Sequence, residues 1–242
     1  MTGAQFIARV YQLLGLPAAH PEVTSGVIAD NYLARVDELT LLVKPPKLRS
    51  YDYLNVVANS ATILLPATFM QGIKVRLQAT SSGPYQDVMP MTEEDLDGQD
   101  PTWQNEASGP VTTYSYAGMV ETLASADYGK RILKLTPTPT TSITDGLLVR
   151  FWRHGTDLIT GTNSQYQIQE VPLGYQLGLA HGVAGLIATD PRINRDPIAH
   201  LQIWQDMVQR YQHFGPEHRE YDYQATGYSS VAQSQRTHWE NQ

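Results

Sequence analysis

Apolar residues recur at helical spacing near the N-terminal end of the chain. In residues 3–15 they fall every three or four positions, and Gly15 follows as a helix stop. A second segment with this spacing covers residues 23–43 and is ended by Pro45 and Pro46, which cannot continue a helix. The pattern therefore predicts two amphipathic helices.

The period changes from helix to strand between residues 51 and 154. Apolar and polar residues alternate strictly over residues 73–78, which predicts a strand with one buried face. Further strand candidates, separated by turns rich in glycine and proline, are residues 61–65, 85–89, 111–116, 130–135 and 147–153. Because no segment of crossover-helix length separates them, we expect an antiparallel β-sandwich or an open barrel.

A glycine-rich apolar segment spans residues 172–190. Gly174, Gly178 and Gly182 recur at every fourth position, with Gly185 beside them, so one face of the predicted helix is nearly bare backbone. Each interior glycine costs a helix about 1 kcal/mol relative to alanine, so we expect another helix to pack closely here. The flanking side chains that we expect in the core are Leu177, Leu179, Val183, Leu186 and Ile187.

The order of the segments predicts an α+β fold. A last helical pattern begins at Asp196-Pro197 and ends at Phe214. We expect the helix pairs at the two ends to close into one bundle, with an antiparallel β-sandwich or barrel-like domain inserted between them. The expected bounds are 1–50 for the N-terminal helices, 51–154 for the β domain, 155–215 for the C-terminal helices and 216–242 for an extended tail.

The tail has few aliphatic residues but contains Tyr221, Tyr223, Tyr228 and Trp239. Such a segment cannot offset its ordering entropy by its own burial, yet these aromatic types are the residues that anchor interfaces. We expect the tail to order against a partner; the alternative is a frayed end with incidental aromatics.

Composition narrows the function classes. The net charge of -7 argues against a protein that grips nucleic acid through phosphates, although DNA could still slide past such a surface. The absence of cysteine excludes disulfides, thiolate catalysis and cysteine-based zinc sites. Because the first residues lack a signal peptide pattern, we expect synthesis in a cytoplasm. The apolar segment at 172–190 is shorter than the roughly 20 residues that span a bilayer, so no membrane is expected.

No phosphate-binding glycine loop, nucleophile elbow or metal-binding helix motif is present, and we expect no cofactor and no metal. Glu93, Glu94, Asp95 and Asp97 could supply an acid and a base for sugar hydrolysis. Adjacent exposed acids are more often a solvated loop, because separating two carboxyl pKa values requires burial of one. We therefore predict no catalytic residue in this loop, which begins with a helix-capping Thr92.

Two pairs of residues that include histidine loosely resemble a catalytic or metal-binding site. His154 with Asp157 resembles part of a catalytic triad, but no serine in a strained turn accompanies them. His213 and His218 flank a Gly-Pro step, which does not provide the rigid scaffold that a metal needs. We expect neither pair to form a site.

Basic residues are spread over the predicted strands rather than gathered into a patch for nucleic acid. They are Lys74, Arg76, Lys130, Arg131, Lys134, Arg150 and Arg153. Their simplest role is solubility and protection of sheet edges. The alternative is a salt-sensitive contact with an acidic neighbouring subunit.

The order of these features resembles the head-to-tail adaptor (connector) proteins of tailed bacteriophages. The similarity covers most of residues 5 to 214 and consists of turns and strand starts. It lies in Ile-Leu-Leu-Pro-Ala-Thr-Phe at 63–69 leading into 72–75, Asp-Pro-Thr-Trp at 100–103, Gly-Pro-Val-Thr-Thr-Tyr at 109–114, and 132–139, followed by the strand at 146–152 and the two closing helices.

This resemblance implies a structural protein of the virion neck, made in the bacterial host cytoplasm. Such adaptors dock below the portal protein, commonly as a ring with twelve-fold symmetry, and extend the DNA channel without sequence-specific binding. They present a platform for the next neck or tail component, a nozzle, stopper or tail tube. In related adaptors the C-terminal tail commonly reaches the portal. The acidic composition suits a channel that passes DNA without friction.

Other functions remain open on the sequence alone. One is a neck stopper or tail-completion protein, one layer further from the portal. Another is a virion protein that binds or degrades the cell wall, to which the β domain and the acidic loop would contribute. The glycine face at Gly174, Gly178, Gly182 and Gly185 has two interpretations as well: packing within one chain, or a seam between adjacent subunits.

Overall fold

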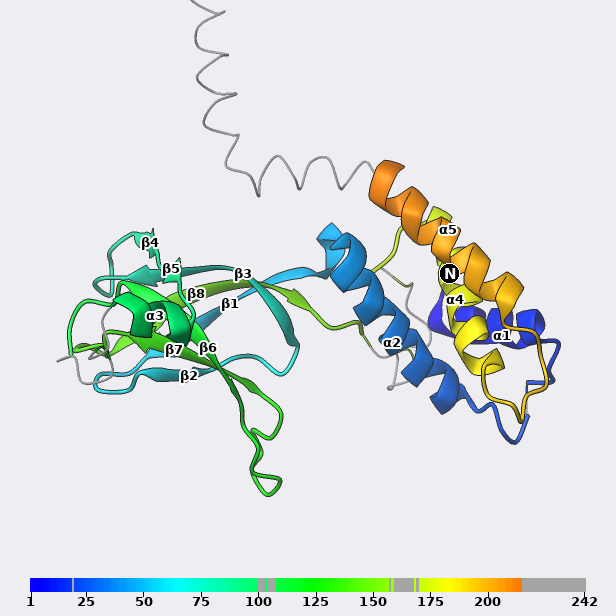
Figure 1. Ribbon diagram of the computed structural model, residues 1–242, viewed down its shortest axis with the longest axis horizontal. Coiled ribbons are helices and arrows are strands. Elements are labelled where there is room, and N and C mark those ends of the chain that lie inside the picture. Colours follow the sequence, from blue (N-terminus) through cyan, green and yellow to red (C-terminus); the bar gives the residue numbers. More distant parts are fainter. Residues whose placement is uncertain are drawn as a thin grey trace, which may run out of the picture. The chain divides into compact units, whose positions relative to one another are not determined.

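The computed structural model describes residues 1–18, 20–99, 103, 108–156, 158, 168 and 170–214. The chain divides into two compact units (Figure 1). A helical unit contains Met1–Leu48 and the described residues from His154 onward, and a β unit contains Arg49–Arg153. The α+β class predicted from the sequence is confirmed.

The helical unit is built from four long helices. They are α1 (Gly3–Leu14), α2 (Ser25–Val43), α4 (Gln176–Ala188) and α5 (Ile198–Phe214), with the short 3-10 turns η1 (Pro46–Leu48) and η4 (Leu173–Tyr175). Helix α4 contacts each of the other three long helices. Its apolar sequence on nearly all sides therefore fits a helix surrounded by protein.

Local signals set the ends of these helices. Thr2 caps α1 in a capping box with Gln5, and Thr24 accepts a hydrogen bond from the Val27 N–H at the start of α2. Gly15 ends α1 in the left-handed conformation, with φ 63°, that glycine adopts most easily. Helix α4 begins at Gln176, directly after η4. The side-chain amide of Gln176 donates to the carbonyls of Ile168 and Val171.

The β unit contains two four-stranded sheets around one hydrophobic core. The first sheet has the order β1-β8-β3-β4 and the second the order β2-β7-β6-β5. The strands are β1 (Arg49–Val56), β2 (Thr62–Leu64), β3 (Phe69–Gln78), β4 (Tyr85–Asp87), β5 (Met89–Pro90), β6 (Thr113–Met119), β7 (Arg131–Thr136) and β8 (Ile143–Arg153). Val75, Val149 and Phe151 from the first sheet share the core with Leu133 and Leu135 from the second. The two sheets therefore share one core, as in a β-sandwich.

The observed sheets differ from the predicted ones in two respects. Strand β5 pairs parallel to β6, so the second sheet is mixed, because the chain crosses over through the helix α3 (Glu93–Gln99) before β6 begins. Each described sheet has two open edges, so the β unit contains no closed barrel. Strand β1, which we did not predict separately, pairs with β8 and lies at an edge with exposed tyrosines that weaken its alternation signal.

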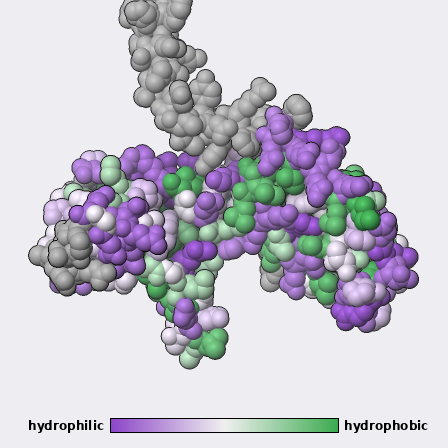
Figure 2. All heavy atoms as spheres, in the orientation of Figure 1, coloured by the Kyte–Doolittle hydropathy of each residue, from purple (hydrophilic) through white to green (hydrophobic). Residues whose placement is uncertain are grey.

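Strands β6 and β7 are connected by a hairpin that projects beyond the sheets (Figure 1). Met119, Leu123 and Tyr128 are exposed on this projection, and Leu123 has 80% of its surface accessible. Figure 2 shows green spheres among purple and pale ones on this projection, so apolar and polar groups are both exposed there. Within the part of the chain that the structure describes, no helix is long and apolar enough to cross a bilayer.

Candidate functional site

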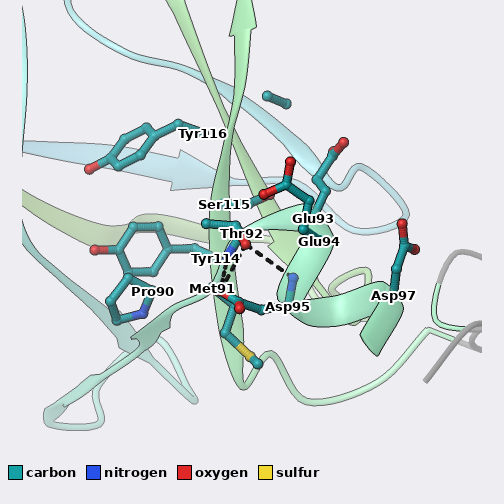
Figure 3. A pocket seen from close by; sticks show the side chains of 11 residues that line it. Pro90, Met91, Thr92, Glu93, Glu94, Asp95, Asp97, Tyr114, Ser115 and Tyr116 are labelled. Atoms are coloured by element: carbon teal, nitrogen blue, oxygen red, sulfur yellow. Dashed lines mark hydrogen bonds between the residues drawn. The ribbon is translucent and has the colours of Figure 1, made fainter. Parts of the chain in front are cut away.

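An open pocket of about 610 Å³ lies beside α3 in the β unit. Glu93 and Glu94 of α3 border it on one side and strand β6 borders it on the other, and the rings of Tyr114 and Tyr116 point away from these carboxylates (Figure 3). We call this the acidic pocket, lined by Pro90, Met91, Thr92, Glu93, Glu94, Asp95, Asp97, Tyr114, Ser115, Tyr116 and Ala117.

The short helix at the pocket is fixed by its first turn. The Asp95 N–H donates to the Thr92 hydroxyl oxygen at 3.0 Å, and that hydroxyl donates to the Asp95 carboxylate at 2.8 Å (Figure 3). The Thr92 hydroxyl, followed by the Thr92 N–H at 3.2 Å, donates to the Asp95 carboxylate and lowers the pKa of Asp95. Asp95 is thereby held as a carboxylate, which suits a structural cap rather than a proton donor.

Helix α3 is fastened to the outer face of the second sheet by Lys134. The Lys134 ammonium lies 3.6 Å from a Glu93 oxygen and 4.3 Å from the centre of the Trp103 ring. Trp103 is buried, and its indole N–H donates to Asp97 at 2.6 Å. The acidic pocket therefore has a rigid base, although its carboxylates remain exposed to solvent.

Polar chemistry of the pocket is concentrated at Ser115 and the two tyrosines. Ser115 is 3% exposed, and its hydroxyl has no hydrogen-bond partner among the described residues. Burial raises the pKa of Tyr114 and, together with the neighbouring Tyr114, raises that of Tyr116 further. Both phenols are thus neutral hydrogen-bonding groups at any physiological pH. The exposed carboxylates are therefore the groups that the pocket offers to an entering ligand.

The acidic pocket has the charge but not the geometry expected for sugar hydrolysis. Glu93, Glu94, Asp95 and Asp97 are all exposed, whereas a general acid of that chemistry is a carboxyl shielded from water. Among the residues described here, no three histidine or acidic side chains are placed to hold a metal ion. The exposed carboxylates are better suited to binding a cationic surface.

A second notable surface is the outer face of the first sheet. Two cross-strand rows run over it: Tyr51, Arg150 and Lys74 form one, and Tyr53, Leu148, Arg76 and Asp87 form the other. Because Val75 and Val149, at alternate positions, point into the core, the residues in these rows point outward. We call this surface the basic tyrosine face and define it by Tyr51, Tyr53, Lys74, Arg76, Asp87 and Arg150.

The charges on this face are only partly paired. Asp87 binds Lys74 at 2.5 Å and Arg76 at 2.8 Å, and the hydrogen bond from Lys74 contributes most to lowering the Asp87 pKa. One carboxylate thus serves two cations. Arg150 has no ion-pair partner within the described parts of the chain. The face therefore carries a net positive charge.

The predicted glycine face of α4 is covered by α5 of the same chain. A Cβ built on Gly178 would lie 2.5 Å from Met207, one on Gly182 would lie 2.7 Å from Trp204, and one on Gly185 would lie 2.8 Å from Leu201. Gly174 lies in η4, before the helix, and has no atom within 4 Å of such a Cβ. The close approach therefore involves Gly178, Gly182 and Gly185. Of the flanking leucines, Leu177 is exposed and does not join the core.

Arg35 of α2 holds this contact together and was not anticipated from the sequence. Its guanidinium donates to the Gly182 carbonyl at 3.1 Å, lies 5.1 Å from the centre of the Trp204 ring, and also pairs with Glu38. A buried arginine at an otherwise unremarkable helical position gives no sequence signal. The missing Cβ of Gly182 is what lets α5 approach so closely.

The described histidines belong to the helical unit, whereas both surfaces belong to the β unit. The Nδ1 atom of His154 lies within hydrogen-bond distance, 2.8 Å, of an Asp37 carboxylate oxygen in α2. Asp157 lies outside the described residues. His213 is bonded to the Gln209 carbonyl in its own helix, and His218 lies outside the described residues. A different pair, His181 of α4 and His200 of α5, has ring nitrogens 2.9 Å apart. Tyr221, Tyr223, Tyr228 and Trp239 also lie outside the described residues.

Sequence reasoning identified the carboxylates of the pocket and the capping role of Thr92, but not Ser115, Tyr114 or Tyr116. Those three belong to a predicted strand, and only the short parallel partner β5 leaves their edge open to α3. Comparison with known proteins adds no further assignment: no protein-family model and no curated protein matches the chain.

Proposed function

We propose that this chain is a structural adaptor of the virion neck of a tailed bacteriophage. In this proposal it forms a ring, commonly twelve-fold in the proteins it resembles, below the portal protein. The ring extends the DNA channel and presents a platform for the next neck or tail component. The resemblance of residues 5 to 214 supplies the identity of the partners.

The observation that carries the proposal is the projecting hairpin between β6 and β7. Its Met119, Leu123 and Tyr128 are exposed, and aromatic residues and methionine are enriched at surfaces that contact another protein. The hairpin between β6 and β7 projects beyond the sheets, where a neighbouring subunit or tail component can reach it (Figure 1).

Two further features support a structural role. The four long helices contact one another through α4, and we propose that they act as one bundle that bears the load of assembly. The net charge of -7 suits a wall past which DNA slides, because attraction to phosphates would slow its passage.

The test is assembly with the matched portal protein. We expect the purified chain to form a ring at one end of the portal, visible by electron microscopy, with a matching increase in particle mass. The absence of any ring under assembly conditions would refute the adaptor function. Peptidoglycan turnover by the wild type that is lost on changing Glu93→Gln, Glu94→Gln and Asp95→Asn together would instead favour a wall-degrading enzyme.

Deleting residues 217–242 separates an adaptor from a component further down the neck. If the tail carries portal binding through its four aromatic residues, the truncated chain should keep its circular dichroism spectrum and lose the portal. Replacing only Tyr221, Tyr223, Tyr228 and Trp239 by alanine is the matched variant, since it preserves the length of the tail. Undiminished portal binding by both variants would contradict this role.

A further inference from the structure

The two outer faces of the β-sandwich carry opposite charge. The basic tyrosine face has three cations and one carboxylate, and the acidic pocket on the other sheet has four carboxylates with Lys134 beside one of them. Among the described residues, neither Arg150 nor Glu94 has an ion-pair partner. Each face thus lacks the charge that the other carries in excess.

The basic tyrosine face also presents rigid aromatic groups. Tyr51 is 65% exposed and Tyr53 is 46% exposed, and their rings meet edge to face at 5.8 Å. Tyr53 in turn lies 5.9 Å from Tyr85, whose hydroxyl donates to the Asp145 carbonyl at 2.6 Å. Exposed tyrosines that are already held in place lose little entropy on binding and are enriched at protein interfaces.

The acidic pocket is built to receive such groups. It is an open recess of about 610 Å³ between strand β6 and the exposed carboxylates of α3 (Figure 3). The Ser115 hydroxyl at its base is buried and has no partner in the part of the chain described. A buried polar group without a partner is costly, so an incoming hydrogen-bonding group would relieve that cost.

We propose that the basic tyrosine face of one copy docks on the acidic pocket of the next copy. This inference rests on the proposed function and specifies which surfaces form the subunit seam of the ring. Because the two surfaces belong to opposite faces of one sandwich, a single chain cannot join its own pair. The contact is heterologous: every copy uses one face toward each neighbour, and repetition closes a ring when the rotation between copies allows it.

A second copy fits the basic tyrosine face better than nucleic acid does. Tyrosines could stack on the bases of a single-stranded nucleic acid and cations could bind its phosphates. The chain as a whole, however, carries a net charge of -7, which repels phosphates. A neighbouring copy supplies carboxylates that are concentrated beside a recess. Electrostatic complementarity of this kind selects the partner and fixes the register of the contact.

The experiment uses charge reversal in the full-length chain. Arg150→Glu reverses the unpaired charge on one face, and Glu94→Lys reverses that on the other. Sedimentation velocity over a range of protein and salt concentrations measures the self-association of each variant. Lys47→Glu, an equal change of charge at an exposed position of η1, is the control. Circular dichroism establishes that each variant is folded.

We expect the wild type to self-associate more strongly at low salt and each single reversal to weaken that association by about tenfold or more. An equimolar mixture of the two single variants should associate again, because every contact then joins one reversed face to the other or two unreversed faces. The variant that carries both reversals should also recover. A misfolded variant could not be rescued in this way.

Several results would overturn the inference. These are a wild type that stays monomeric at low salt, reversals that leave association unchanged, and a mixture that does not recover. Binding of a single-stranded oligonucleotide that Arg150→Glu abolishes, without self-association, would assign the face to nucleic acid instead. The proposed function is tested separately: rings on the portal that tolerate both reversals would retain the adaptor and reject this seam. If the mixed variants recover self-association in solution but no ring forms on the portal, this seam is retained and the adaptor function is rejected.

Discussion

Replacing Gly182 with alanine tests the close packing of α4 against α5. An ideal Cβ at this position lies 2.7 Å from Trp204 Cε3 and 2.8 Å from Cδ2, whereas ordinary contacts begin at 3.4 Å. The helix and the ring must therefore separate by the difference, 0.7 Å. Trp204 is 2% exposed and Arg35 covers its ring, so the indole has little room to move.

The expected cost follows from two opposing terms. Overpacking a well-packed core costs about 1–3 kcal/mol, and the rigidity of the indole places this site in the upper part of that range. Alanine returns about 1 kcal/mol through its better helix propensity. We therefore expect Gly182→Ala to lower the free energy of unfolding by about 1–2 kcal/mol.

Gly174→Ala is the matched control, because no atom lies within 4 Å of its Cβ position. Its effect should stay within about 0.5 kcal/mol. Urea unfolding followed by far-ultraviolet circular dichroism gives both values from the midpoints, provided that the slopes agree. A Gly182→Ala variant as stable as the wild type would refute the packing argument. A stable monomer that fails to form rings would instead indicate a seam between subunits.

Three further predictions concern the helical unit. The pKa of His181 is lowered by burial and then by His200 and Arg9, so the unfolded chain binds a proton more readily; the free energy of unfolding should fall as the pH drops through about 6.5, and an identical pH profile for His181→Gln would contradict this. Gln176→Leu leaves two buried backbone carbonyls without their donor and should cost about 2 kcal/mol in urea unfolding, whereas no loss would mean that other donors replace it. Thr24→Ala removes the cap of α2 and should cost about 1 kcal/mol, and Thr24→Ser should restore most of it.

The local structure of this chain was largely predictable because it depends on short-range signals. Gly15 and Pro45 mark helix ends wherever they occur, and alternation over residues 73–78 allows only a strand with one buried face. The Thr92 cap of α3 follows from the same kind of signal. The carboxylates of the acidic pocket could also be identified in advance, since they are neighbours in the chain.

The tertiary structure decided which distant residues meet. His154 has its carboxylate partner in Asp37, which lies 117 positions away, and Lys134 pairs with Glu93 across the second sheet. Likewise, only packing brings Ser115 to the base of the acidic pocket and Trp204 against Gly182. The crossover that makes β5 parallel to β6 was likewise decided by the tertiary structure.

The sequence by itself determined the succession of helices and strands, their approximate ends, and the α+β class, because backbone periodicity and capping act over a few residues. The tertiary structure alone decided that basic and acidic residues separate onto opposite outer faces of one sandwich. That separation depends on strand order and register, which a local pattern does not encode. The charges were visible in the sequence, but their arrangement as two complementary surfaces was not.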